Sequence, residues 1–246
     1  MSHLTAQDVA RTTPEELARL MAGPPEAFVP WARAAAEAGL VEAQAIYAQM
    51  LLDGRGVPPD PAAALQWFTR AARADHLMSI NMVGLCHENG WGTAQDSEAA
   101  ADWFRVAASR GLDWGLYHYA HFHATGRAGV PRDLGRAYAL YRQAADMGHL
   151  PSIGAVGRFH ENGEIVALDM DQAFECYQRA AEGGDYRGMF HYARLLYERD
   201  RVPEALSWFA RVPAAATPAF MQEARRILHE TGDPVLAELY PLPASA

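Results

Sequence analysis

A repeat of about 36 residues runs along most of this 246-residue chain and limits what it can fold into. It is clearest over Gly54–Ala72, where a glycine turn and a proline-marked start lead into an apolar segment with a Trp-Phe and an Ala-Ala pair. The alanine before the aromatic recurs at intervals of 36, 37, 36 and 32 residues, as Ala64, Ala100, Ala137, Ala173 and Ala205. A period of this length holds two helices and two turns, which predicts an all-α solenoid of stacked antiparallel helix pairs.

The two helices of each repeat, here named helix A and helix B in chain order, are joined by a turn with a constant pattern. The turn glycines are Gly54, Gly90, Gly126 and Gly163. An acidic residue follows each of them, as Asp60, Asp96, Asp133 and Asp169. A carboxylate at this place accepts hydrogen bonds from the first free N–H groups of a helix, so helix B is expected to begin there.

Helix A contains two sets of small residues at matching positions of the repeats. The first set is Ala43, Ser79, Gly115, Ser152 and Gly188. The second set is Ala48, Gly84, Ala120, Gly157 and Ala193. Because glycine inside a helix costs roughly 1 kcal/mol relative to alanine, its recurrence predicts that a neighbouring helix leaves no room for a side chain.

These residues resemble the Sel1-like repeat, a relative of the tetratricopeptide repeat. The first unit matches that family's pattern through Gly54-Arg55-Gly56-Val57-Pro58, Asp60, Ala64, Trp67 and Ala71-Ala72. The resemblance covers residues 41–185 and implies a right-handed α-solenoid whose A helices line the concave surface. The fifth unit departs from the pattern, because Arg199 stands at the turn glycine and Val212-Pro213 replaces the alanine pair.

The repeat pattern also predicts the domain organisation. Residues 1–40 are expected to form N-terminal capping helices of a degenerate repeat, which include a helix from Thr13-Pro14-Glu15-Glu16 and a B helix over residues 26–38. The repeats are expected over residues 41–76, 77–112, 113–149, 150–185 and 186–213. Residues 214–246 are expected to close the stack with capping helices over Pro218–Glu230 and Pro234–Tyr240.

Charge and composition exclude several classes of partner. The net charge is −9, from 21 basic residues, all of them arginine, and 30 acidic residues. Without a cationic footprint, neither nucleic acid nor an anionic membrane surface is an expected partner. The absence of lysine removes Schiff-base chemistry and the lysine of a phosphate-binding loop. No apolar stretch reaches the length of a membrane span, and the first residues lack an apolar leader, so a cytoplasmic protein is expected.

Candidate chemical sites in the sequence have structural interpretations. His87, His123 and His160 occupy one position of three repeats, but packed helices lie roughly 8–10 Å apart whereas a metal–imidazole bond is about 2 Å. His118 and His121 lie on the same face of a helix, so a weaker hypothesis that they bind a metal ion stays open. The Gly-x-Gly turns follow a helix and lack a third glycine, and both cysteines fall among apolar positions. We therefore predict no catalytic residue, no metal site and no cofactor.

The remaining signal is a face of helix A whose residues differ from repeat to repeat. Its predicted partner-binding residues are Met78, Asn81, Trp114, Tyr117, His121, Arg158, Arg187, Phe190 and Arg194. Trp, Tyr, Phe and Arg are enriched at interface hot spots. The sequence thus predicts a non-enzymatic adaptor or scaffold that binds a peptide or protein segment in a concave groove.

Two alternatives come from the resemblance. Cysteine-rich proteins similar to this family are associated with binding or hydrolysis of β-lactams, but this chain lacks their paired cysteines. Other Sel1-like proteins are envelope-associated scaffolds, an alternative that the missing apolar leader disfavours.

Overall fold

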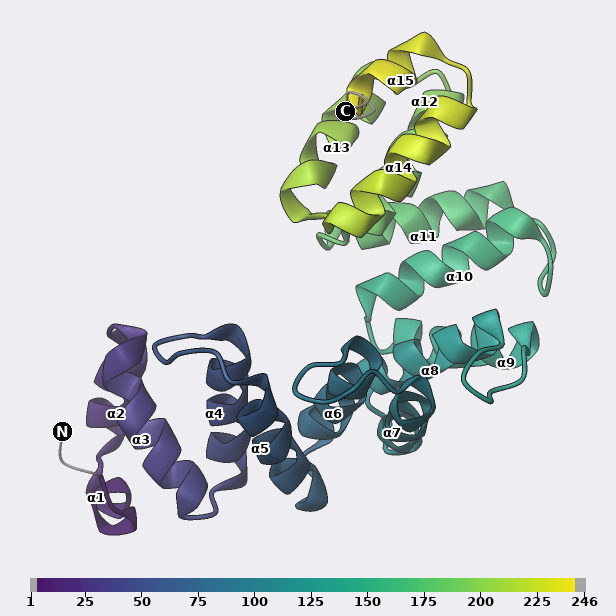
Figure 1. The fold of residues 1–246 in the computed structure, drawn as a ribbon. Helices are drawn as coiled ribbons and strands as arrows, with labels where there is room; N and C mark the ends of the chain where they lie inside the picture. The colour runs from purple at the N-terminus through teal and green to yellow at the C-terminus, as the bar shows by residue number, and fades with distance from the viewer. Residues whose placement is uncertain (1–3, 242–246) are drawn as a thin grey trace. The chain divides into compact units, whose positions relative to one another are not determined.

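The computed structural model describes residues 4–241, which form helices and connecting turns without any strand (Figure 1). Residues 1–3 and 242–246, the outermost parts of the predicted caps, lie outside the described residues. The helices are α1 Ala6–Arg11, α2 Pro14–Ala22, α3 Pro25–Glu37, α4 Val41–Asp53, α5 Pro61–Arg73, α6 Leu77–Asn89, α7 Ser97–Ser109, α8 Asp113–Thr125, α9 Leu134–Asp146, α10 Leu150–Asn162, α11 Met170–Glu182, α12 Tyr186–Glu198, α13 Val202–Ala215, α14 Pro218–Glu230 and α15 Pro234–Leu239.

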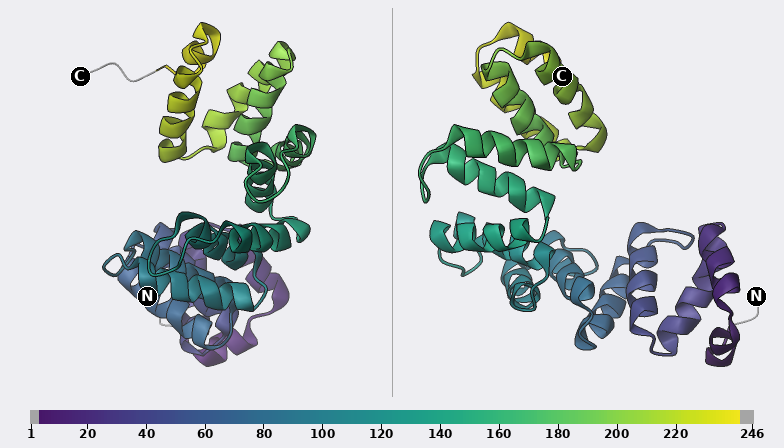
Figure 2. Two further views of the ribbon diagram at one scale, coloured as in Figure 1. Left: turned by 90° about the vertical axis from the view of Figure 1, so that its right-hand side faces the viewer. Right: turned by 180° about the vertical axis from the view of Figure 1, so that it is seen from behind.

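The chain divides into two compact units, Met1–Asp133 and Leu134–Ala246. In the first unit the helices α3 to α8 pack in succession, each against its neighbour within the unit, and in the second unit α9 to α13 do the same (Figure 2). The A helices of the five repeats are α4, α6, α8, α10 and α12, and the B helices are α5, α7, α9, α11 and α13. The predicted all-α fold of stacked helix pairs is therefore confirmed.

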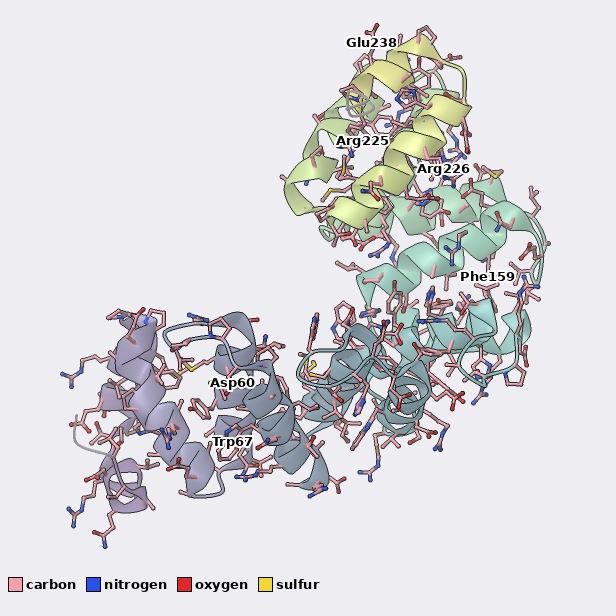
Figure 3. All side chains as sticks on the ribbon, viewed as in Figure 1. Asp60, Trp67, Phe159, Arg225, Arg226 and Glu238 are labelled. Atoms are coloured by element: carbon pink, nitrogen blue, oxygen red, sulfur yellow. The ribbon has the colours of Figure 1, made fainter. Side chains whose placement is uncertain are left out.

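The turns between helices A and B have the predicted geometry. Each turn glycine ends its A helix in the left-handed conformation, as at Gly54 with φ 68° and Gly90 with φ 71°. The carboxylate of Asp60 then accepts a hydrogen bond of 2.9 Å from the N–H of Ala63, at the start of α5 (Figure 3). The fifth repeat, which lacks the glycine, places Asp200 in the left-handed conformation instead, with φ 59°.

The second glycine of the Gly-x-Gly turns brings each turn against the preceding repeat. A Cβ atom on Gly56 would lie 2.6 Å from the carbonyl carbon of Pro25, at the start of α3. A Cβ atom on Gly92 would collide with the backbone of Pro61, at the start of α5. These turns thus rest on the first residues of the preceding B helix, which excludes any larger residue at this place.

The small residues of helix A lie where two helices approach each other most closely. All ten members of the two small sets are buried. A Cβ atom on Gly115 would lie 2.5 Å from the Cβ atom of Ala107, and one on Gly188 would lie 2.5 Å from that of Ala180. The alanine pair of helix B and the small position of the following helix A therefore form a direct contact, as the sequence predicts.

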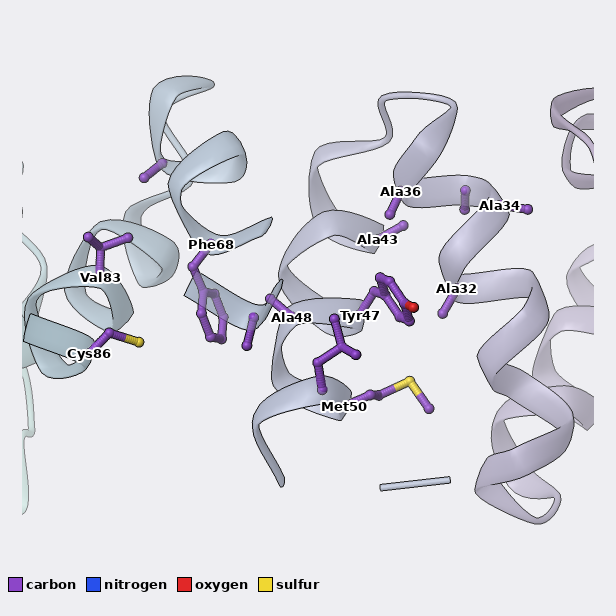
Figure 4. Packing of buried hydrophobic residues seen from close by; sticks show 14 of the residues in the cluster. Ala32, Ala34, Ala36, Ala43, Tyr47, Ala48, Met50, Phe68, Val83 and Cys86 are labelled. Atoms are coloured by element: carbon purple, nitrogen blue, oxygen red, sulfur yellow. The ribbon is translucent and has the colours of Figure 1, made fainter. Parts of the chain in front are cut away.

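Larger side chains fill the space on either side of this contact. The second aromatic residue of each B helix is almost fully buried: Phe68, Phe104, Tyr141, Tyr177 and Phe209. At the start of the stack, Tyr47 and Ala43 of α4 face Ala32 and Ala36 of α3 (Figure 4). One cluster of buried residues thus runs from α1 to α7 in the first unit, and another runs from α11 to the end of α15 in the second.

The terminal helices follow the predicted pattern with one addition. Thr13 and Glu16 form the predicted capping box, in which Thr13 N–H donates to the Glu16 carboxylate at 2.9 Å. A further helix, α1, precedes it and begins with a second capping box between Thr5 and Asp8. The sequence pattern did not indicate α1, because six residues are too few to show helical periodicity.

The glycines of α10 give a matched test of the close-contact interpretation. A Cβ atom on Gly157 would lie 2.9 Å from Cys176 Cβ and 3.2 Å from the Tyr177 ring, whereas one on Gly154 would meet nothing closer than 3.9 Å. We expect Gly157→Ala to lower the free energy of unfolding by about 1–3 kcal/mol through overpacking. Gly154→Ala is expected to raise it by roughly 0.5–1 kcal/mol through helix propensity. Urea denaturation followed by circular dichroism measures both, and the same sign for the two variants would contradict the interpretation.

Candidate functional site

In the first unit, two large apolar side chains are exposed at equivalent positions near the starts of successive A helices. Met78 of α6 is 42% exposed and Trp114 of α8 is 38% exposed. His121, two turns further along α8, is also exposed. These three residues of the first unit, Met78, Trp114 and His121, are called the A-helix face.

Trp114 is held in place by the rings around it. Its indole stacks on the imidazole of His118 with centroids 5.8 Å apart, and His118 stacks in turn on Phe104 of α7 at 4.6 Å. The half-buried Tyr117 meets the Trp114 ring edge-on, with centroids 6.0 Å apart. Such ring contacts restrict the side chain before a partner binds, so ordering Trp114 costs little on association.

Two predicted partner-binding residues lie inside the helix stack. Asn81 is buried, and its Oδ1 atom has no hydrogen-bond partner. Phe190 is fully buried, with its ring 5.6 Å from Phe220 of α14 and 5.7 Å from Phe209 of α13. Their position on helix A faces the next repeat rather than solvent. These two side chains therefore have almost no exposed surface that a partner could contact.

In the second unit the A helices expose arginine. Arg158 of α10 is exposed and forms no ion pair with another described residue. Arg187 of α12 is exposed as well, and its guanidinium lies over the rings of Tyr186 and Phe220, at 4.6 and 5.7 Å from their centroids. These two guanidinium groups remain available for carboxylates, which arginine binds in a bidentate manner.

Arg194 has a different role, because it is half-buried and already paired. Its guanidinium binds Glu161 of α10 and lies 2.6 Å from the carboxylate of Glu198. The hydroxyl of Tyr177, on α11, donates to Glu161 at 2.6 Å. Burial would raise the pKa of Glu161, but the Tyr177 hydrogen bond and the Arg194 charge outweigh it and lower that pKa. Glu161 therefore stays ionised and joins three helices.

The Glu161 cluster was not indicated by the sequence analysis. Glu161 and Arg194 lie 33 residues apart, three residues short of the repeat period, which places them on facing turns of neighbouring A helices. This spacing is the signal that would have found the pair. The cluster therefore holds the side chain of Arg194 in place.

His191 completes the cluster as a half-buried neutral base. Its ring stacks on Tyr177 with centroids 4.9 Å apart. Burial, with a contribution from the Arg194 charge, lowers the pKa of His191 to about 4. The imidazole therefore stays uncharged between the two arginine-bearing A helices.

At the ends of α6 and α10 it is the backbone of the histidine that contacts the turn, since the buried Nδ1 atoms of His87 and His160 have no hydrogen-bond partner within residues 4–241. The backbone carbonyls of His87 and His160 accept hydrogen bonds of 2.8 and 2.9 Å from the N–H groups of Asp96 and Asp169. His118 is stacked between Trp114 and Phe104. Among the described residues, no three His, Cys, Asp or Glu side chains come together as a metal site.

Both cysteines are free, and Cys176 is half-buried. Cys86 is buried, and this burial raises the pKa of its thiol to about 11. Burial also raises the pKa of the Cys176 thiol. Separately, no helix within residues 4–241 is long and apolar enough to cross a membrane.

The repeats match a known family. The model of the Sel1 repeat matches residues 41–76, 77–112, 115–149 and 153–185, which together make up more than half of the chain. The chain belongs to the Sel1 repeat family. Proteins built from Sel1 repeats generally mediate protein–protein interactions.

Known relatives and structures agree with this assignment. The chain is 26% identical over 232 residues to the chitin synthase regulator SKT5 of Saccharomyces cerevisiae, an alignment that covers 73% of this chain and 33% of the yeast protein. The chain thus spans about a third of that relative's length. A Sel1 repeat protein from Oxalobacter formigenes has a similar fold, with a TM-score of 0.73, 24% identity, and coverage of 92% of this chain and 96% of the other. So does c5321, a protective antigen of uropathogenic Escherichia coli, with a TM-score of 0.66, 23% identity, and coverage of 95% and 53%.

The lowered pKa of His191 predicts a pH dependence of stability. Between pH 6.5 and about 4 the unfolded chain binds a proton that the folded chain does not. The contribution of His191 is therefore fully present above pH 6.5 and is lost as the pH falls toward 4. Between pH 7 and pH 5 we expect the free energy of unfolding to fall by about 2 kcal/mol more for the wild type than for His191→Leu. Urea titrations at the two pH values measure this difference, and equal falls would contradict the assignment.

Proposed function

We propose that this Sel1 repeat protein is a non-enzymatic scaffold whose A-helix face binds a peptide or protein segment. The observation that carries the proposal is Trp114, which is 38% exposed although rings of its own helix and of α7 hold it in place. A soluble protein gains nothing in stability from leaving such a ring in water. A rigid, exposed Trp is the typical anchor of a binding hot spot.

The two units offer different chemistry along their A helices. The first unit presents the apolar side chains of Met78 and Trp114, and the second presents the guanidinium groups of Arg158 and Arg187. On a protein with a net charge of −9, unpaired arginines are sites where a carboxylate of the partner gains most. We therefore propose that the A-helix face of the first unit binds an apolar segment, and that the arginines of the second unit bind an acidic one.

The relatives support the same class of function. The yeast relative is named as a regulator of chitin synthase and not as an enzyme. A regulatory scaffold, acting through a bound protein, is thus our preferred role.

The exposed tryptophans provide a matched pair of variants. Trp114 lies on the A-helix face, whereas Trp91, which is 39% exposed, lies in the turn after α6. We expect Trp114→Ala to weaken binding of the cellular partner roughly 30-fold or more, as loss of a hot spot of about 2 kcal/mol does. Trp91→Ala is expected to bind like the wild type.

The measurement is quantitative affinity purification from the source cells, followed by titration of the recovered partner against each variant. Circular dichroism melting curves establish that both variants are folded. A partner that binds Trp114→Ala as tightly as the wild type would contradict the proposal.

A further inference from the structure

A pocket in the first unit lies apart from the A-helix face. It is formed by α2, α3 and α4, has a volume of about 160 Å³, and is called the N-terminal pocket. Its walls are Met21 of α2, Phe28 of α3, and Ile46 and Met50 of α4, with Arg55 beside them. Met21 is 56% exposed and Ile46 is 37% exposed, so the pocket opens to solvent through apolar side chains.

The pocket lies in the degenerate first repeat. The A helices α4, α6, α8, α10 and α12 each have 13 residues, whereas α2 has nine. At the positions that match Ile46, Met82 of α6 and His118 of α8 are half-buried, whereas Ile46 is exposed. The start of the stack therefore exposes an apolar side chain of α4 that the later repeats partly cover.

The walls of the pocket are held in place before any ligand binds. Phe28 stacks on Trp31 with centroids 5.7 Å apart, and the indole N–H of Trp31 donates to the Thr12 hydroxyl at 3.0 Å. Met50 is buried and extends from α4 toward α3 (Figure 4). The two methionines, Met21 and Met50, adapt their shape to what enters, because the thioether side chain is flexible. The site is thus rigid on one side and adaptable on the other.

Arg55 provides the single charge among the residues that line the pocket. It belongs to the turn Gly54-Arg55-Gly56, which is pinned because Gly56 packs on the backbone of Pro25. The exposed guanidinium forms no ion pair or hydrogen bond with another described side chain. An unpartnered cation beside an apolar pocket attracts a ligand that has a carboxylate next to its apolar group.

We propose that the N-terminal pocket binds one bulky apolar side chain of an acidic peptide segment, whose neighbouring carboxylate pairs with Arg55. The volume decides the size of the group, since a cavity of roughly 150 Å³ accommodates a benzene molecule. One Leu, Ile, Met or Phe side chain fills the available 160 Å³. The occupant is thus a partner protein's segment with the pattern of one such residue beside Asp or Glu. This site is separate from the A-helix face, so each has its own diagnostic variant.

The test is selection of a phage-displayed library of random 12-residue peptides on the full chain, followed by fluorescence anisotropy of the selected peptides. Wild type and Arg73→Glu, a control for an exposed arginine at the end of α5, are expected to select a bulky apolar residue next to Asp or Glu. Ile46→Asp and Met21→Asp, both at exposed positions, are expected to weaken these peptides at least about tenfold. Arg55→Glu is expected to change the preferred neighbour from an acidic to a basic residue.

Three results would overturn the proposal. The first is that no sequence pattern is enriched on the wild type. The second is that the selected peptides bind folded Ile46→Asp and Met21→Asp as tightly as the wild type. The third is that Arg55→Glu leaves the charge preference unchanged. Peptides that lose affinity for Trp114→Ala but not for Ile46→Asp would assign binding to the A-helix face and not to the pocket.

Discussion

The structure depends on the contact between the alanine pair of each B helix and a small residue of the next A helix. At Gly115 and Gly188 the helices are so close that a single added carbon would lie 2.5 Å from an alanine Cβ atom. This spacing lets the aromatic residues on either side, such as Phe104 and Tyr177, fill the core without voids. The turns follow from the same constraint, because a second turn glycine rests on the preceding helix where no side chain fits. Repetition of these contacts explains why the same few residue types recur about every 36 positions.

The residues that repeat and the residues that vary therefore have different roles. Small, aromatic and cap residues are determined by stacking, so they leave little freedom for recognition. The exposed A-helix residues are free of that constraint: the first unit has Met78 and Trp114 there, and the second unit has Arg158 and Arg187. The end of the stack provides a second source of variation, since the N-terminal pocket lies between the short α2 and its neighbours α3 and α4. Both proposed binding sites lie where the repeat pattern is relaxed.

Most of the fold could be predicted from the sequence, because the turn glycines, the Asp caps and the alanine pairs each act over a few residues. The candidate site could be predicted less completely. Helical periodicity places Asn81 and Phe190 on the same broad face as Trp114, but it does not indicate which neighbouring helix covers them. The ring of Phe190 packs against Phe220 of α14. This terminal helix lies outside the repeats, so the repeat pattern does not predict its contacts. The N-terminal pocket likewise lies among the degenerate first helices, where the repeat pattern does not apply, and the ion pair of Glu161 and Arg194 depends on the offset between neighbouring A helices.

Hydrogen–deuterium exchange of Gly115→Ala tests most directly whether close helix approach is the constraint on which the stack depends. The added methyl group would collide with Ala107 and with the backbone of Ala107 and Ala108. The account predicts that amide exchange becomes faster in α7 and α8, and that the free energy of unfolding falls by about 1–3 kcal/mol. Exchange as slow as in the wild type, with a free energy of unfolding raised as for a helical glycine in open space, would contradict it.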